Sequence, residues 1–485
     1  MKKHGKVSII FCVMMFVLIM LAGCGDTPLA TDSIDEHNSP ASTPSDSGNN
    51  PAPTPSDSDN DLGTDPTEPP FWAPPPIPIE TLEIDPTQTG ELVIYPPPFS
   101  LFWLDPVINL YKEVYPNVDL IIEDLGNDFY AYGTRVSAEL MAGTGPDIIF
   151  PALMFGADMF KMADAGAFLD LNELIEQDDS FNLDDYIKPV MDGGIYRGKR
   201  YIMPFSYTVN VMLSTPSKLN EIGFDISQMD DPLSFINEVV RTLPKAQENS
   251  MFQSTLSGGM WIYLLTSSGT KYIDFETNTV LPNEEFLEDL VKAYKPYRPF
   301  DHAIYDAQHT HLLNGTVIFG GCSNILDFIM LGSQLKTFGD IQMNVIPDIS
   351  GNIRTFNTLG ASIRASSDNN QNAWNFIKLL LSQENQSRDT FQNIPVHKNS
   401  IIAQIESKYN YWDGAMDNMV FTKLSADEIQ TFIDMVININ QSSAFHSSPA
   451  DAIFLKHIEL YYKDEITYDD AIARVRNDLN LYLSE

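Results

Sequence analysis

Short apolar strands alternate with amphipathic helices at the start of the globular sequence, and this order restricts the fold more than any other feature. The apolar runs predict strands at 91–95, 118–122 and 147–150. A strand–helix–strand–helix–strand order predicts an α/β fold with a parallel sheet and right-handed crossovers. Ligands of such sheets bind beyond the carboxyl ends of the strands. The loops at 99–103 and 151–155 are therefore predicted to lie at a binding site.

The two helices between these strands have separate start and stop signals. Asp105 followed by Pro106 predicts an N-cap with proline at the first helical position. In the second helix, Phe129 and Val136 belong to an apolar stripe at helical spacing, and Gly143 predicts its end. Each helix is thus expected to bury one face against the sheet.

One stretch near the middle of the chain is predicted to be a strand at the wall of a cleft. Between positions 205 and 213, apolar side chains alternate with Ser206, Thr208 and Asn210. This alternation indicates one buried and one solvated face. Pro204 before it indicates a strand start or a sheet edge. An ordinary half-exposed strand would show the same pattern, so the cleft interpretation depends on the neighbouring sequence.

The amino terminus is typical of an exported protein. Residues 1–23 combine a basic start, a short apolar core and small residues before Cys24. The core is short for a bilayer span of about 20 residues. The Leu-Ala-Gly-Cys ending resembles the lipobox of bacterial lipoproteins, in which the cysteine is acylated and becomes the new amino terminus. We expect a lipid such as palmitate at Cys24 and a location on the extracellular face of the cell membrane. An uncleaved anchor is the alternative.

Residues 24–89 are predicted to form a disordered tether between this anchor and the globular region. The segment is rich in Ser, Thr, Pro, Asp and Asn, and no Lys or Arg occurs between Lys6 and Lys112. Few apolar side chains are present to offset the entropy of ordering. Trp72, in its Pro-rich part, is interpreted as a packing anchor, with a ligand contact as the alternative.

The charge balance argues against several classes of partner. The chain has 29 Lys and Arg against 66 Asp and Glu, a net charge of −37. Such a surface repels phosphate backbones and anionic headgroups. We therefore expect no nucleic-acid partner and no peripheral membrane binding through charge.

No sequence pattern indicates catalysis or a metal site. Phosphate-binding, dinucleotide-binding, zinc-protease and esterase motifs are all missing from the sequence. A metal cluster at His302, His309 and His311 is weighed against a solvated polar segment, and the second is favoured. Cys322 would be the single thiol of the globular region and is expected to be buried. We expect no cofactor, although the abundant carboxylates leave a glycosidase-like pair open.

Seven segments in the same order resemble the family 1 extracellular solute-binding proteins, the receptor lipoproteins of carbohydrate ABC importers. Each segment is weakly specific alone, but together they extend over about 390 residues. The segments are 115–124, 138–150, 168–175, 194–213, 313–321, 344–348 with 359–386, and 394–400.

The resemblance implies a two-lobed periplasmic-binding-protein-like fold of type II, with lobes joined by crossing hinge strands. Lobe one would be 90–206 plus 360–390, and lobe two 207–359 plus 391–485. It also implies a carbohydrate ligand, ABC permease partners and a monomer. Trp374 lies in an apolar helical stripe and is expected in the core.

The chain departs from the family pattern near the expected ligand. The segment 321–324 stands where relatives often have a tryptophan, and Phe319 replaces a usual methionine. Pro151 and Met154 stand where some relatives place an aromatic residue and a carboxylate. The fold prediction does not depend on these positions, but the identity of the ligand does.

The predicted ligand-binding residues combine aromatic platforms with short polar side chains, because sugars offer apolar faces and polar edges. Core packing is the alternative for each tryptophan. The set is Phe102, Trp103, Ser206, Tyr207, Thr208, Asn210, Trp261, Ser323, Asn324 and Trp412.

Three functions remain open at this point. The first is a transport receptor that binds a carbohydrate, most simply an oligosaccharide, without reacting with it. The second is an extracellular glycan-processing enzyme, and the third is a lipid-tethered ligand-sensing module. The tether, the two-lobe pattern and the missing catalytic motifs favour the receptor.

Overall fold

The structure, a computed structural model, describes residues 84–248, 252–253, 268–296, 317–322, 324–355, 357–388, 393–415 and 422–485. They belong to one compact unit, Trp72–Glu485. The predictions for the export signal, Cys24, the tether and Trp72 lie outside the described residues. Across the described part of the chain, none of the helices is long and apolar enough to span a bilayer.

A six-stranded sheet is the frame of the first half of the fold, with the strand order β14-β6-β13-β3-β1-β2. The predicted parallel arrangement is confirmed, because β1 pairs in parallel with both β2 and β3. The later strands β13 and β14 join it antiparallel. The strands are β1 Gly90–Ile94, β2 Val118–Ile122, β3 Ile148–Ile149, β6 Met203–Thr208, β13 Asn357–Ile363 and β14 Ile394–Pro395.

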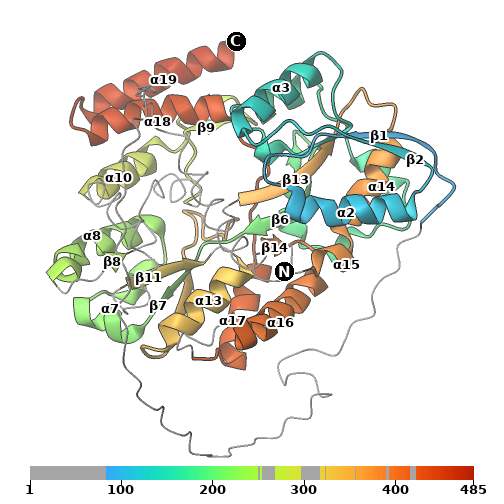
Figure 1. The fold of residues 1–485 in the computed structure, drawn as a ribbon. Helices are drawn as coiled ribbons and strands as arrows, with labels where there is room; N and C mark the ends of the chain where they lie inside the picture. The colour runs from blue at the N-terminus through green and yellow to red at the C-terminus, as the bar shows by residue number, and fades with distance from the viewer. Residues whose placement is uncertain are drawn as a thin grey trace, which may run out of the picture. The chain divides into compact units, whose positions relative to one another are not determined.

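Helices cover this first sheet, and α2, α3 and α14 lie around it in Figure 1. The predicted core position of Trp374 is confirmed, since its side chain is 1% exposed. Its indole N–H donates to the Asp178 carboxylate at 2.7 Å. The helices and turns of this half are α2 Leu101–Val114, α3 Phe129–Met141, η2 Pro151–Leu153, α4 Met159–Asp164, α5 Asn172–Glu176, η3 Leu183–Asp185, α6 Lys188–Asp192, α14 Asn370–Leu381 and α15 Gln383–Gln386.

The predicted start of the first helix is wrong. Asp105 was expected as the N-cap, but α2 begins at Leu101 and contains Pro106. The Ser100 hydroxyl donates to the Pro97 carbonyl at 2.6 Å, and the Leu104 N–H donates to the Ser100 carbonyl at 2.9 Å. Leu104 is fully buried. Pro106 is the sixth residue of α2, so it removes one helical hydrogen bond, and tertiary packing of the first turn outweighs both this cost and the local signal.

A second sheet has four strands in the order β12-β7-β11-β8. Helices α13, α16 and α17 lie together beside it, and α18 and α19 lie side by side near α10 (Figure 1). The strands are β7 Val211–Ser214, β8 Phe252–Gln253, β11 Val317–Cys322 and β12 Gln342–Val345. The helices are α7 Pro216–Ile222, η4 Ile226–Met229, α8 Pro232–Glu248, α10 Glu284–Tyr294, α13 Ile325–Lys336, α16 Lys398–Ala415, α17 Ala426–Ile437, α18 Ser448–Tyr462 and α19 Tyr468–Ser484.

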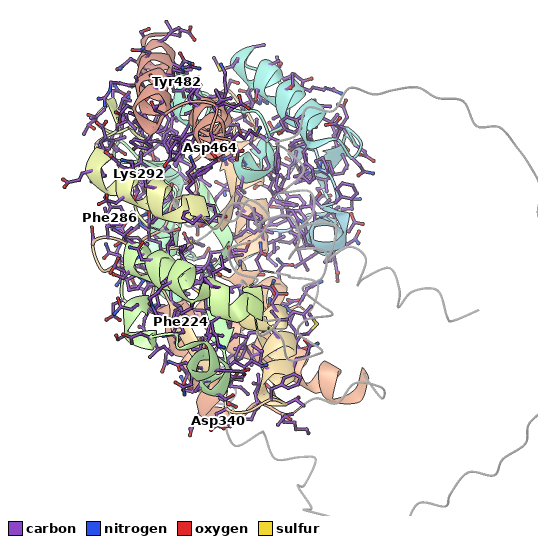
Figure 2. The ribbon with its side chains drawn as sticks, turned by 90° about the vertical axis from the view of Figure 1, so that its left-hand side faces the viewer. Phe224, Phe286, Lys292, Asp340, Asp464 and Tyr482 are labelled. Atoms are coloured by element: carbon purple, nitrogen blue, oxygen red, sulfur yellow. The ribbon has the colours of Figure 1, made fainter. Side chains whose placement is uncertain are left out.

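The second half has its own apolar core. Helices α8, α10, α18 and α19 bury one continuous cluster, and Phe235 and Phe454 in it are fully buried. Phe224 is a buried member of this cluster and Phe286 packs against it partly buried; both are labelled in Figure 2. Two short hairpins, β4 Ile195–Tyr196 with β5 Lys199–Arg200 and β9 Ile273–Asp274 with β10 Thr279–Val280, complete the described strands.

The stretch predicted as one continuous strand is two strands in different sheets. The break falls at Val209–Asn210, between β6 and β7. The predicted solvated face of β6 is also wrong, because Ser206 is 1% and Thr208 is 6% exposed. β6 lies between β14 and β13 and is packed by α6 and α14, so both faces are covered. Pro204 is accommodated opposite Gly360, where the β13 register shifts.

Candidate ligand-binding site at the strand crossings

The first connection between the two sheets is a two-residue crossing. β6 ends at Thr208 and β7 starts at Val211. Asn210 is half-buried, whereas its neighbours from 203 to 214 are buried. The Tyr207 hydroxyl donates to the Val436 carbonyl at the end of α17, at 2.8 Å. Burial raises the pKa of Tyr207 well above its usual value. The crossing is thus held at Tyr207, and Asn210 is its accessible polar side chain.

The second crossing, from β12 to β13, is organised by the Asp348 carboxylate. It accepts from the Ser350 and Asn352 N–H groups, both at 2.8 Å, and from Arg354 Nε at 2.7 Å. Burial alone would raise the pKa of Asp348, but these hydrogen bonds lower it. A buried carboxylate with this many donors fixes a loop in one conformation.

A third segment, residues 438–447, runs between the two halves and is hydrogen-bonded to both. The Thr355 N–H donates to the Gln441 carbonyl at 2.9 Å, and the Ala444 N–H donates to Gly193 at 2.9 Å. The hydroxyl oxygen of Ser442 lies 2.9 Å from that of Thr355 and 3.0 Å from that of Thr358. This hydroxyl cluster was not predicted, because its members are far apart in the sequence.

The loop after β3 connects the first sheet to α18 and α19. The Asp158 carboxylate caps α4 at Lys161 N and accepts from the Tyr482 hydroxyl. That hydroxyl also lies 2.9 Å from Ser447 Oγ, and Lys161 Nζ donates to the Tyr482 carbonyl at 2.7 Å. Tyr482 lies on α19 (Figure 2). The carboxyl edge of the first sheet is therefore fixed to the second half.

Two titratable groups next to this junction have strongly shifted pKa values. Burial, with the nearby Asp158 charge, raises the pKa of Asp451 to about 7. Burial lowers the pKa of His446 to about 4, although the nearby negative charge of Asp158 acts to raise it. Both shifts favour the uncharged side chain, because burial disfavours charge on each of these two groups.

Two of the predicted site residues flank the first crossing from opposite sides. The Trp103 ring is 7% exposed and lies 5.3 Å from the Phe205 ring of β6. Asn324 follows β11, whose Cys322 pairs with Val211. Asn324 is half-buried and caps α13 through Asp327 N at 2.9 Å.

Of the remaining predicted residues, Ser206 accepts from Asn393 Nδ2 at 3.4 Å, and Ser206, Tyr207 and Thr208 are buried on β6. Trp261 and Ser323 lie outside the described residues. Phe102 lies in the first turn of α2 and Trp412 lies in α16, and their side chains are also outside the described part. The ligand-binding set as a whole stays a prediction.

The described residues contain no group of three or more His, Cys, Asp or Glu side chains that could hold a metal ion. The histidines at 302, 309 and 311 lie outside those residues. Cys322 is buried, as expected, and its thiol donates to the Val211 carbonyl at 3.4 Å.

Two α/β halves joined by strand crossings define the class of two-lobed periplasmic-binding proteins. A family model described as bacterial extracellular solute-binding protein matches residues 101–387. The chain belongs to this family, whose members are binding proteins of ABC importers and not enzymes. No curated protein matches the chain.

Solved structures support the same fold. The chain is similar to the ABC substrate-binding protein Lmo0181 from Listeria monocytogenes in complex with cycloalternan, with a TM-score of 0.54 and 14% identity, covering 82% of this chain and 100% of that one. The chain is also similar to the GacH receptor of Streptomyces glaucescens, solved with acarbose. The TM-score is 0.54 and the identity 14%, and the match covers 82% of this chain and 99% of that one. UgpB from Mycobacterium tuberculosis, in complex with glycerophosphocholine, has the same TM-score of 0.54 and the same identity of 14%, and the match covers 82% of this chain and 99% of UgpB. At these identities the likeness shows the fold.

Relative to the predicted lobe boundaries, β6 stays in the first sheet to Thr208 and β13 enters it at Asn357. β14, at Ile394–Pro395, also belongs to the first sheet. The crossings thus lie at 209–210 and between 346 and 356.

Proposed function

We propose that the protein is a lipid-anchored extracellular receptor that captures a carbohydrate, most simply an oligosaccharide, between its two lobes and delivers it to an ABC importer. The observation that carries the proposal is the family match over residues 101–387. The relatives solved with cycloalternan, acarbose and mannotriose support a carbohydrate ligand. UgpB, solved with glycerophosphocholine, makes a phosphodiester the competing ligand class.

The net charge of −37 disfavours ligands with a net negative charge, because a strongly acidic protein repels anions at long range. It does not separate a neutral sugar from glycerophosphocholine, which is a zwitterion without net charge. The buried hydroxyl of Thr358 and the half-buried amide of Asn393 are groups of the kind that suit sugar hydroxyls.

A thermal-shift panel tests the ligand class. Purified protein without its first 23 residues is melted with mannotriose, maltotriose, xylotriose and glycerophosphocholine. A ligand at 100 times its dissociation constant stabilises the folded state by about 2.7 kcal/mol. We expect a shift with at least one trisaccharide and none with glycerophosphocholine. The reverse result would assign the protein to the phosphodiester class.

Lipid anchoring is tested separately at Cys24. We expect Cys24→Ser to release the domain from membranes or to stop its processing. Because Cys24 lies in the leader and not in the folded unit, ligand binding should be unchanged. A variant that is processed and retained like the wild type would contradict the lipoprotein proposal.

A further inference from the structure

Four aromatic side chains gather at the carboxyl edge of the first sheet, away from the predicted tryptophans. We call Phe99, Phe129, Tyr130 and Phe155 the aromatic platform. The Phe129 and Phe155 ring centroids lie 5.0 Å apart. Phe99 lies 5.9 Å from Phe129, and Tyr130 lies 5.9 Å from Phe155. The rings come from the loop after β1, the start of α3 and the loop after β3.

The platform is covered on one side only. Phe129 is 7% exposed and belongs to the buried stripe of α3. Tyr130 is 51% exposed, and Phe99 and Phe155 are half-buried. One exposed ring and two half-buried rings are therefore open to solvent beside a buried one, and contiguous exposed apolar surface commonly marks binding sites.

The backbone beneath the platform is held in place. Phe99 has a φ of 56°, a left-handed conformation that bulky residues rarely adopt and that concentrates at ligand sites. Gly133 lets α3 lie directly against the loop, because a β-carbon there would meet the Phe155 carbonyl oxygen. At Gly156 a β-carbon would lie 3.5 Å from the Tyr130 ring. The loop and α3 are therefore packed without free space between them.

The platform also lies where the two halves of the molecule meet. Gly156, next to Phe155, donates its N–H to Ser448 Oγ at the start of α18, at 3.3 Å. Asp158, two residues further, forms a β-bridge with Ser447. Since this edge carries the carboxyl ends of β1 and β3, the platform occupies the position where α/β sheets bind ligands.

We propose that the aromatic platform is a stacking subsite for one pyranose ring of the bound carbohydrate. This inference rests on the proposed function and names a part of the site that the sequence did not indicate. The C–H face of a sugar packs on aromatic rings, while its hydroxyls need polar neighbours. Asp124 and Asn127 are exposed in the loop that enters α3, a few residues before Tyr130, and offer polar side chains in that loop.

Two variants and one matched control test the platform by isothermal titration with mannotriose, maltotriose and xylotriose. Tyr130→Ala and Phe155→Ala each remove a ring. Met141→Ala removes an equally exposed side chain at the other end of α3, where Met141 is 59% exposed. We expect about a tenfold loss of affinity for the trisaccharide that the wild type binds best, and no loss in the control. Tyr130→Phe should retain the affinity.

The monosaccharide of the same series separates stacking from a structural effect. If one ring of a longer ligand stacks on the platform, Tyr130→Ala should reduce the ratio of trisaccharide to monosaccharide affinity, with an unchanged melting temperature. Wild-type affinity in both variants would overturn the subsite while leaving the proposed function intact. A dimer that dissociates in the variants would assign the platform to a second copy and would also overturn it. If the wild type binds no sugar, the proposed function fails and the subsite with it.

Discussion

Two aromatic groups lie within a few residues of each other in the first half of the molecule, and they differ in exposure. The inner group is Trp103 with Phe150 and Phe205, whose ring centroids lie 5.6 and 5.3 Å from the tryptophan. All three side chains are at most 7% exposed. The outer group is the aromatic platform, in which Tyr130 is 51% exposed.

This difference shows that an aromatic residue in a predicted binding loop is not by itself a ligand contact. Trp103 follows three prolines and reads as a loop residue, but α2 already includes it. Its ring is turned towards β6 and fills the interior. Tyr130 lies on a helix, next to Phe129 but outside the buried stripe of α3. The following experiments test whether the inner group contributes mainly to stability and the outer group mainly to ligand binding.

The largest effect is expected for Trp103→Ala. The change removes a ring packed against Phe150 and Phe205, so unfolding free energy should fall by about 3–5 kcal/mol. Urea denaturation measures it. If stability is retained and sugar affinity is lost, Trp103 is a ligand contact and the distinction between the two groups fails.

A smaller loss is expected for Gly133→Ala. The added methyl group would meet the Phe155 carbonyl, so the loop under the platform must shift, at a cost of about 1–3 kcal/mol. Thr134→Ala, at the next and exposed position of α3, is the control and should be neutral or stabilising. Equal stability of the two variants in thermal unfolding would show that the loop is not held by this contact.

The junction beside the platform should make stability depend on pH through Asp451. Its pKa is 3.8 in a model compound and about 7 in the folded state. A raised folded-state pKa contributes stability that is complete below pH 3.8 and is lost as pH rises towards and beyond 7. Asp451→Asn should therefore gain stability over the wild type as pH rises from 4 to 8, on the order of 1 kcal/mol.

The pKa of His446 is shifted in the opposite direction to that of Asp451. The two contributions to stability therefore change with pH in opposite directions, and the wild type alone would not show the effect of Asp451. The pKa of His446 is lowered to about 4, and its contribution is lost as pH falls below 6.5. It acts equally in both proteins and cancels in their difference. The melting temperatures of the wild type, Asp451→Asn and the exposed control Asp469→Asn are compared from pH 4 to 8. A constant difference between the first two would contradict the prediction.

The smallest effect on stability is expected for Tyr130→Ala. An exposed ring contributes little to folding, so unfolding free energy should change by less than about 0.5 kcal/mol. Urea denaturation beside Trp103→Ala gives the direct comparison of the two groups. A loss above about 2 kcal/mol would mean that the platform is part of the core.

Local patterns were sufficient for much of the fold. The stripe of α3 and the burial of Trp374 follow from spacing within a single element. The parallel pairing of the first three strands follows from the alternation of strands and helices. The capping box at Ser425 and Glu428 is present at the start of α17 as its four-residue motif predicts. The strand order alone also predicts a site at the loops after β1 and β3, and this position stays a prediction.

Features that depend on contacts between distant segments required the tertiary structure. The start of α2 is set by the packing of Leu104, and both faces of β6 are covered by elements far along the chain. The hydroxyl cluster joins Thr355 and Ser442, and the junction joins Asp158 and Tyr482. Whether an aromatic ring is buried or exposed depends on what other segments place against it, and alternation or composition within one segment does not contain that information.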